Sequence, residues 1–307
     1  MIETWQQPLP HGITLSCRGA GERGRPVLVF LHGFPEAAFV WDGLLAHFAR
    51  PEHGGYRCVA PNLRGYERSS APAEVGAYRV KHLVQDIAAL VAAEGAPLEC
   101  LVAHDWGGAV AWNLANQRPE LLRRLAIVNS PHPGTFLREL RDSRVQQEAS
   151  AYMNFLVRPD AEQLLAQDDY RRLWGFFGAW GDARWLTEAV RDQYRHVWNG
   201  PAGGPPGAGL QGGCNYYRAA PLRPPTPQDP GAAAVTLPPE SLTVDLPTLV
   251  LWGMQDTALP PGLLDGLEAY VRDLTLERVE GASHWIVHER PAFVAERLSA
   301  FLRRPLQ

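Results

Sequence analysis

Lysine is almost absent from this chain of 307 residues: Lys81 is the only one, and arginine carries nearly all the other positive charge. Schiff-base chemistry needs a lysine, so it is disfavoured because Lys81 alone would have to supply it. The four cysteines, at positions 17, 58, 100 and 214, are far apart and form no C-x-x-C pair. A zinc site or a disulfide framework is therefore disfavoured.

Long hydrophobic segments are also missing. No apolar run approaches the ~20 residues needed to span a bilayer, and the N-terminus lacks the basic and apolar regions of a signal peptide. The formal net charge of −4 gives no reason to expect nucleic acid or an anionic membrane as a partner. We expect a cytoplasmic protein that acts on small molecules, without a nucleic-acid or membrane partner; homo-oligomer formation is left open.

Short apolar runs alternate with helical patterns in the first part of the chain. Val27 to Leu31, for example, is a continuous apolar run, which is typical of a strand buried on both faces. Such alternation predicts a mostly parallel central sheet flanked by helices, which is an α/β fold. The predicted strands are 27–31, 56–60, 100–104, 125–128, 247–252 and 274–279.

Helical, aromatic-rich segments and two stretches rich in Gly and Pro interrupt this alternation in the middle of the chain. Breaker-rich stretches of this kind are typical of surface loops or linkers. We predict an α/β core made of residues 1–132 and 245–307, with a mainly helical cap inserted over 133–244.

Asp105 stands at the junction of a predicted strand and a predicted helix, in the run His104-Asp105-Trp106-Gly107-Gly108. Small residues, Ala103 and Gly107, flank it on both sides, which lets strand and helix approach each other around a strained turn. This is the logic of the nucleophile elbow G-x-S-x-G, with Asp in place of Ser. The alternative is that Asp105 simply caps the following helix. A serine esterase is disfavoured, because the elbow has no Ser or Cys.

Two further polar residues follow predicted strands later in the chain. Asp256 comes after the strand at 247–252, and His284 after the strand at 274–279. In open parallel sheets, sites form outside the carboxyl ends of the strands, and the order nucleophile, acid, histidine is that of α/β-hydrolase triads. Taken singly, Asp256 could be a turn residue and His284 a hydrogen-bonded loop residue. Together with Asp105 they favour a catalytic triad.

Four segments resemble those of the α/β-hydrolase superfamily, and within it of the epoxide hydrolases. They are His32-Gly33-Phe34-Pro35-Glu36, the Asp105 elbow, Gly253-Met254-Gln255-Asp256 and Gly281-Ala282-Ser283-His284-Trp285. The resemblance implies that epoxides are converted to vicinal diols. Asp105 would form an ester with the substrate, and His284, oriented by Asp256, would activate the water that hydrolyses it. Neither a metal nor an organic cofactor is implied.

The resemblance also implies a pair of cap tyrosines that hold the epoxide oxygen. Asn215-Tyr216-Tyr217-Arg218 resembles the second tyrosine segment of the family and nominates Tyr217, with Tyr216 as the alternative. Tyr152 fits the first. Phenols titrate near ~10, so they stay protonated at pH 7 and can donate to the opening ring. The alternative is that these tyrosines are ordinary amphipathic cap residues.

Other residues complete the expected site. The backbone N–H groups of Phe34 and Trp106 fit an oxyanion hole. Glu36 is either an ordering residue close to the site or a solvated loop acid, and His32 is a second residue expected to support the site. Three further aromatic residues are candidates for lining the substrate pocket: Tyr216, Phe155 and Trp180.

Two other functions compete with this interpretation. A haloalkane dehalogenase would share Asp105, Asp256 and His284, but it would need a second halide donor where Phe34 stands and would not need the tyrosines. A hydrolase-fold receptor or binding protein with little turnover is the alternative of another class. The intact set of nucleophile, acid and base argues against it, although the fold alone cannot decide.

Overall fold

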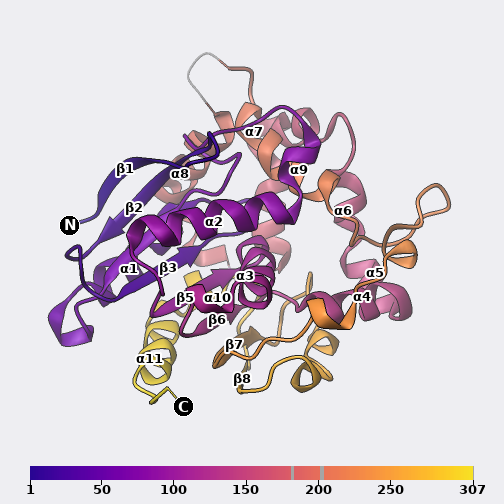
Figure 1. Cartoon of the computed structure of the whole chain (residues 1–307). Coiled ribbons are helices and arrows are strands. Elements are labelled where there is room, and N and C mark those ends of the chain that lie inside the picture. The colour runs from indigo at the N-terminus through magenta and orange to yellow at the C-terminus, as the bar shows by residue number, and fades with distance from the viewer. Residues whose placement is uncertain (181–182, 201–203, 307) are drawn as a thin grey trace.

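The computed structural model describes residues 1–180, 183–200 and 204–306, without the side chains of 179 and 180. A sheet in the order β1-β2-β4-β3-β5-β6-β7-β8 forms its centre (Figure 1). Neighbouring strands from β4 to β8 are parallel, whereas β2 runs antiparallel to both β1 and β4. The bounds are β1 Glu3–Pro8, β2 Thr14–Ala20, β3 Val27–Leu31, β4 Arg57–Pro61, β5 Cys100–His104, β6 Leu125–Val128, β7 Thr248–Gly253 and β8 Leu274–Val279.

The six predicted strands are present as β3 to β8, with shifts of one residue at the ends of β4 and β7. All residues of β3, β5 and β6 are buried, as expected for strands covered on both faces. The sequence patterns did not predict β1 and β2. β1 is a half-exposed edge strand rich in polar residues, and therefore lacks the apolar run by which the other strands are recognised.

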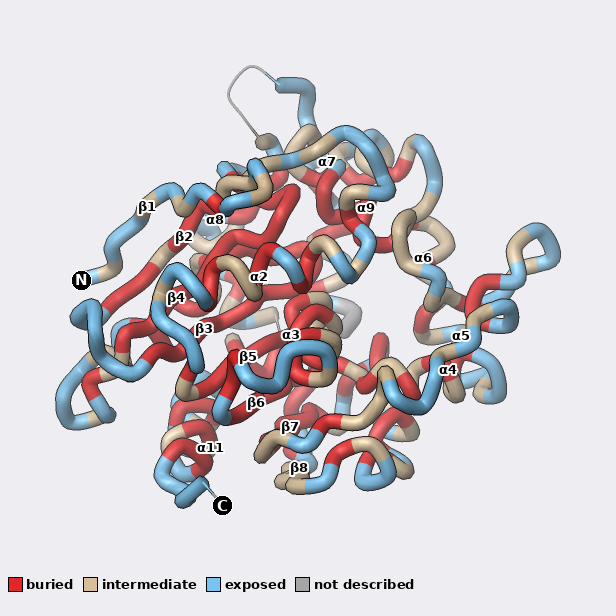
Figure 2. The backbone as a smooth tube through the Cα atoms, in the orientation of Figure 1, coloured by how far each residue is buried: buried red, intermediate tan, exposed pale blue. Residues whose placement is uncertain are grey.

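Helices cover both faces of the sheet. Helices α2 (Val80–Glu94) and α3 (Trp106–Gln117) pack on one face, and α1 (Asp42–Phe48) and α11 (Pro291–Leu302) on the other. The side chains of β3 alternate accordingly: Val29 belongs to the first apolar cluster and Phe30 to the second. Figure 2 shows this distribution, with buried strands inside and the exposed backbone on the outer turns of the helices.

A helical region is inserted between β6 and β7, as predicted. It has its own apolar cluster, which includes Leu165, Phe177 and Trp198 and which packs on Phe34 and Trp285 of the core. The helical region is thereby seated over the carboxyl ends of the strands. The bounds of an independent cap at 133–244 stay a prediction. The inserted helices are α4 Pro133–Asp142, α5 Arg144–Ala149, α6 Ala151–Leu156, α7 Ala161–Trp180, α8 Glu188–Asn199 and α9 Gln211–Ala219, and α10 Ile286–Glu289 lies in the core.

Candidate active site

Asp105 sits on a sharp turn between β5 and α3, with φ 49° and ψ −122°. Such a conformation is strained for a residue with a side chain. It needs small neighbours, because a Cβ on Gly107 would lie 2.6 Å from the Leu31 carbonyl oxygen, and one on Gly108 would lie 2.3 Å from the Ser130 side chain. Ser130 Oγ donates to the Asp105 carbonyl oxygen at 2.7 Å and so holds the turn.

The Asp105 carboxylate faces the loop that follows β3. The backbone N–H of Phe34 donates to Oδ1 at 2.7 Å. A Cβ on Gly33 would lie only 2.3 Å from the Asp105 side chain, so this close approach requires glycine. The carboxylate makes no capping hydrogen bond to α3. The geometry therefore does not support the alternative that Asp105 is an ordinary helix cap.

Asp256 and His284 come together beside Asp105, although 28 residues separate them in the chain. Asp256 Oδ2 bonds to His284 Nδ1 at 2.7 Å, and His284 Nε2 lies 3.8 Å from Asp105 Oδ2. Asp256 is buried but well satisfied, since its Oδ1 accepts from the backbone N–H groups of Ala258 and Leu259 at 2.9 and 2.8 Å. A buried carboxylate with such donors is held in one orientation.

The charge of His284 reflects these two carboxylates. Burial by itself lowers the pKa of the imidazole, but Asp256, through its charge and its hydrogen bond, together with the charge of Asp105, raises the pKa to about 9. The imidazole is therefore protonated at neutral pH. Any change that neutralises Asp105 lowers the pKa of His284.

Tyr152 of α6 and Tyr217 of α9 lie against each other above Asp105, with ring centroids 6.0 Å apart. Burial raises the pKa of both hydroxyls, and the charge of Asp105 raises both further, so both stay protonated. Tyr217 also packs edge-on against Phe34 and Trp106, at 5.3 and 5.2 Å between centroids. Its position is thus determined by the same residues that were expected to form the oxyanion hole.

Tyr216 is oriented differently from its neighbour. Its hydroxyl donates to the Arg64 carbonyl oxygen at 3.0 Å, while its ring packs edge-on against Trp106 at 5.4 Å. Phe155 packs in the apolar cluster of the inserted helices, with the Arg172 guanidinium 5.7 Å from its ring centroid. The side chain of Trp180, the remaining pocket candidate, lies outside the described residues.

A cavity of about 580 Å³ opens above the elbow, a volume within the usual range for small-molecule sites. Asp105 is the one carboxylate among its described lining residues, and the walls are mainly apolar and aromatic. Its lining residues include Asp105, Trp106, Tyr152, Tyr216, Tyr217, Ser130, Phe136, Met153, Leu222, Leu237, Arg79 and Lys81.

His32 supports the loop that carries Phe34. Its Nε2 accepts from the Leu63 backbone N–H at 3.0 Å, and its Nδ1 lies 2.9 Å from the Gly33 carbonyl oxygen. Burial lowers the pKa of His32 to about 4, so the ring is neutral and can both accept and donate. The loops after β3 and β4 are joined in this way.

Glu36 is fully buried rather than solvated. It accepts from His104 Nδ1 at 3.1 Å, from His288 Nε2 at 2.5 Å and from the Tyr194 hydroxyl of α8 at 2.9 Å. Burial alone raises the pKa of Glu36, but the charge of His288 and the hydrogen bonds from both histidines outweigh it and hold the pKa well below its usual range. His104 Nε2 lies 2.9 Å from the His284 carbonyl oxygen, so this network reaches the candidate base.

Two residues that contribute to the site were not predicted from the sequence. Asn129, at the end of β6 with φ 39°, donates from Nδ2 to Asp256 Oδ2 at 2.7 Å and accepts from the Gly253 backbone N–H at 2.9 Å. The other is His104, whose ring centroid lies 4.7 Å from that of His284. For Asn129, the available signal was a polar residue directly after a predicted parallel strand.

No helix among the described residues is both long and apolar enough to cross a membrane. In the same part of the chain, no group of three or more His, Cys, Asp or Glu side chains is arranged to hold a metal ion.

Known proteins resemble this chain in sequence and in fold. The family model described as the alpha/beta hydrolase fold matches residues 26–291. The AB hydrolase superfamily protein YfhM of Bacillus subtilis is 34% identical, over 95% of this chain and 96% of its own. Mouse epoxide hydrolase 4 is 31% identical, over 95% of this chain and 77% of its own.

Solved structures resemble the chain over nearly its full length. A structure described as one of the novel epoxide hydrolases from metagenomes of hot environments has a TM-score of 0.86 and 35% identity, covering 99% of this chain and 100% of its own. The inhibitor complex of Bacillus megaterium epoxide hydrolase has a TM-score of 0.84 and 30% identity, with 98% and 100% covered. The chain belongs to the α/β-hydrolase family, and within it to the epoxide hydrolases and their relatives.

Proposed function

We propose that this protein is an epoxide hydrolase that converts epoxides to vicinal diols through an ester on Asp105. One arrangement carries the proposal: the Asp105 carboxylate shares a single cavity with two protonated phenols, Tyr152 and Tyr217, while His284 stands on its other side. A nucleophile and proton donors that face each other suit the opening of a strained ether, whose alkoxide leaving group is poor.

In the first step, Asp105 Oδ2 attacks a ring carbon of the epoxide. The new C–O bond to the carboxylate forms as the ring C–O bond breaks, and the departing oxygen takes a proton or strong hydrogen bonds from Tyr152 and Tyr217. Oδ1 is held by the Phe34 N–H, which leaves Oδ2 as the free attacking atom. An aspartate needs no base to activate it, because it is ionised at neutral pH.

In the second step, water hydrolyses the ester at the Asp105 carbonyl carbon. The ester is neutral, so the pKa of His284 falls and the imidazole can accept a proton from the water. Asp256 orients the ring and stabilises the imidazolium that forms. The tetrahedral oxyanion develops on the oxygen already bonded to the Phe34 N–H, with the Trp106 N–H as the expected second donor. As the ester C–O bond breaks, His284 returns this proton to the departing oxygen of the diol. The remaining proton of the water passes to His284, and the proton that His284 released on esterification re-protonates the tyrosine, so the diol leaves and the carboxylate is restored.

The geometry favours this activity over its competitors, and Tyr217 over Tyr216 as the second donor. Phe34 offers Asp105 a backbone N–H but has no polar side chain to hold a halide, as a haloalkane dehalogenase would require. Tyr216 donates to a backbone carbonyl, whereas Tyr217 is coupled to Tyr152 and Asp105, which favours Tyr217 as the second donor. A receptor with little turnover would not need His284 positioned beside the carboxylate.

A single-turnover experiment in ¹⁸O water tests the ester. With enzyme in excess over styrene oxide, we expect ¹⁸O in the Asp105 carboxylate first and in diol only after later turnovers. The His284→Gln variant should accumulate the ester, visible as added mass on the peptide that contains Asp105. Label that enters diol directly, with none in Asp105, would rule out the ester route.

A neighbouring pair of variants tests the tyrosine assignment. Tyr217→Phe removes the proposed donor, and we expect roughly 10²-fold slower ester formation. Tyr216→Phe removes an equivalent hydroxyl one residue away that bonds to the Arg64 carbonyl, and it serves as the matched control with a smaller loss. Equal losses in the two variants, or halide release from chloroalkanes without diol formation from epoxides, would overturn the assignment.

A further inference from the structure

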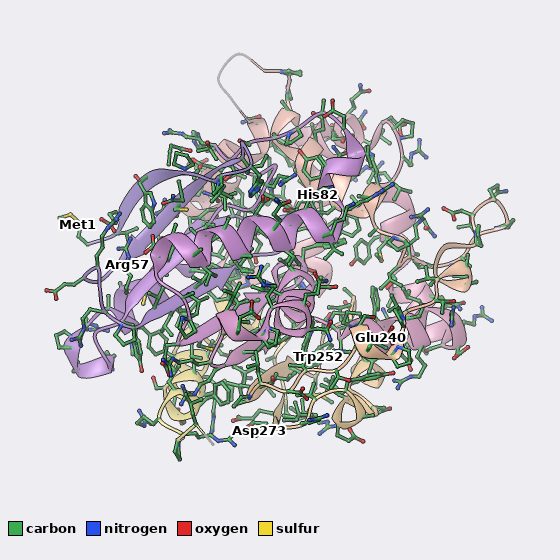
Figure 3. The ribbon with its side chains drawn as sticks, in the orientation of Figure 1. Met1, Arg57, His82, Glu240, Trp252 and Asp273 are labelled. Atoms are coloured by element: carbon green, nitrogen blue, oxygen red, sulfur yellow. The ribbon has the colours of Figure 1, made fainter. Side chains whose placement is uncertain are left out.

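One side chain of the inserted helices reaches the turn that carries Asp256. Gln146 lies on α5 and is only 1% exposed. Its Nε2 donates to the Ala258 carbonyl oxygen at 3.2 Å, although the two residues are 112 positions apart in the chain. Ala258 belongs to the turn after β7; Figure 3 labels Trp252, near the end of this strand. The Gln146 amide therefore connects the inserted helices (Figure 1) to the turn of the candidate acid.

The same Nε2 atom makes a second hydrogen bond, this one within the inserted helices. It donates to Ser150 Oγ at 2.7 Å. Ser150 is buried at the junction of α5 and α6, and its backbone N–H donates to the Gln146 carbonyl oxygen at 2.8 Å. Tyr152 follows two residues later, in α6. One amide group thus binds both the start of the helix that carries a proposed proton donor and the turn that carries the acid.

The contact with Ala258 acts directly on the orientation of Asp256. The Ala258 carbonyl and the Leu259 N–H are opposite ends of one planar peptide unit. Asp256 Oδ1 accepts from this Leu259 N–H at 2.8 Å, and Asp256 Oδ2 bonds to His284 Nδ1 at 2.7 Å. Gln146 therefore holds one end of the peptide unit whose other end holds the carboxylate that orients His284.

Packing alone does not account for a glutamine at this position. The Gln146 Oε1 is buried and has no hydrogen-bond partner among the described residues, and an unsatisfied buried acceptor costs stability. An apolar side chain of similar length would fill the space without this cost. Exchanging the two ends of the amide would not help, because the Ala258 carbonyl can only accept a hydrogen bond. What the amide supplies here is its pair of donated hydrogen bonds.

We propose that Gln146 is a positioning residue for both steps of the reaction, because its amide holds the helix of Tyr152 and the turn of Asp256 in one fixed arrangement. This inference rests on the proposed epoxide hydrolase function and adds a residue that does not belong to the described lining of the cavity. Tyr152 takes part in ring opening, and Asp256 takes part in ester hydrolysis through His284. One side chain outside the cavity thus sets the geometry of both steps.

The Gln146→Met variant removes both donated hydrogen bonds and keeps the length of the side chain. It also removes the unsatisfied Oε1, so we expect it to fold with the circular dichroism spectrum of the parent protein. Ester formation and ester hydrolysis, followed separately with styrene oxide by rapid quenching and mass spectrometry of the Asp105 peptide, should each slow by roughly tenfold. The pKa of His284, measured by NMR, should fall below about 9, because a loosened turn weakens the hydrogen bond from Asp256.

Two further variants separate the hydrogen bonds of Gln146 from general effects on α5. Ser150→Ala removes only the acceptor before α6, so ester formation should slow by roughly three- to fivefold, while ester hydrolysis and the His284 titration stay unchanged. The matched control is Gln147→Met, at the next position of α5. The Gln147 amide donates instead to the carbonyl oxygens of Leu140 and Arg141, at 2.9 and 3.0 Å. The control should keep both rates and the His284 titration of the parent protein.

The outcomes distinguish this inference from the function on which it rests. Parent rates for both steps in Gln146→Met, equal losses in Gln147→Met, or a His284 titration that does not change in Gln146→Met would each refute the positioning role. If Gln146→Met does not fold, Ser150→Ala decides: slower ester formation with normal hydrolysis supports the role, and parent rates for both steps overturn it.

Absence of any ester in the parent protein would count against the proposed function instead. The His284 titration would then decide on Gln146 alone. A fall in the pKa of His284 confined to Gln146→Met would support the link to the acid turn, and an unchanged pKa would refute it.

Discussion

Two carboxylates hold the proton on His284, and neutralising one of them should lower the pKa of this imidazole. Asp256 bonds to Nδ1 at 2.7 Å, and Asp105 Oδ2 lies 3.8 Å from Nε2. The Asp105→Asn variant imitates the neutral ester, since it removes the charge and keeps the shape of the side chain. We expect the pKa of His284 to fall from about 9 in the parent protein.

The size of the fall follows from the geometry. Two charges about 4 Å apart interact by about 4 kcal/mol at an effective dielectric constant near 20. One pH unit corresponds to about 1.4 kcal/mol, so complete loss of the interaction lowers the pKa of His284 by at most about three pH units. Because the cavity is open to water, we expect a fall of roughly one to two pH units.

NMR titration of ¹⁵N-labelled histidine measures this directly. The control is Asp42→Asn, which removes a carboxylate that pairs with Arg18 on the surface at the start of α1 and should leave the His284 titration unchanged. In kinetic terms, ester hydrolysis should rise with pH around a midpoint below 9. If His284 titrates identically in Asp105→Asn and the parent protein, esterification does not switch this histidine into a base, and the reasoning for the second step fails.

Three further perturbations test the structure around the site. Gly33→Ala places a Cβ 2.3 Å from the Asp105 side chain, so single-turnover ester formation should slow by roughly 10²-fold while the circular dichroism spectrum is retained; a normal rate would contradict the close approach. Asn129→Ala leaves Asp256 and the Gly253 N–H each without one partner, so urea unfolding should show a loss of about 1–3 kcal/mol; a loss below 0.5 kcal/mol, of the order expected for surface changes, would argue against this role. Burial lowers the pKa of His132 to about 4, so its contribution to stability is present above pH 6.5 and is lost as the pH falls through 4. His132→Asn keeps an acceptor for the start of α4 and should make the acid-side fall in stability shallower by up to about 3 kcal/mol; an unchanged slope in pH-dependent melting would refute the assignment.

The local pattern of apolar residues was sufficient to predict the strands that are completely buried. β3, β5 and β6 are covered on both faces, so each appears in the sequence as an unbroken apolar run. Asp105 could be selected because a strained turn between strand and helix needs small neighbours, and Gly107 meets that need. β1 could not be predicted in this way, because an exposed edge strand has no buried face to set a pattern.

The candidate catalytic residues of the core could be predicted from the sequence, because parallel strands end at one edge of the sheet. Asp105, Asp256 and His284 each follow such a strand, and this rule alone brings them together without knowledge of side-chain contacts. Asn129 follows a strand as well, but its link to Asp256 depends on the neighbouring positions of β6 and β7, which only the folded sheet defines.

The sequence by itself determined the six parallel strands of the sheet, the order of the three polar residues and the acidic identity of the expected nucleophile, because these depend on burial pattern and on strand ends. Only the tertiary structure decided which of Tyr216 and Tyr217 faces Asp105, since successive residues of a helix point about 100° apart and the packing of α9 sets the rotation. It also decided that the amide of Gln146 reaches the turn after β7. That placement depends on how α5 lies against the core, and such contacts between distant segments leave no local trace in the chain.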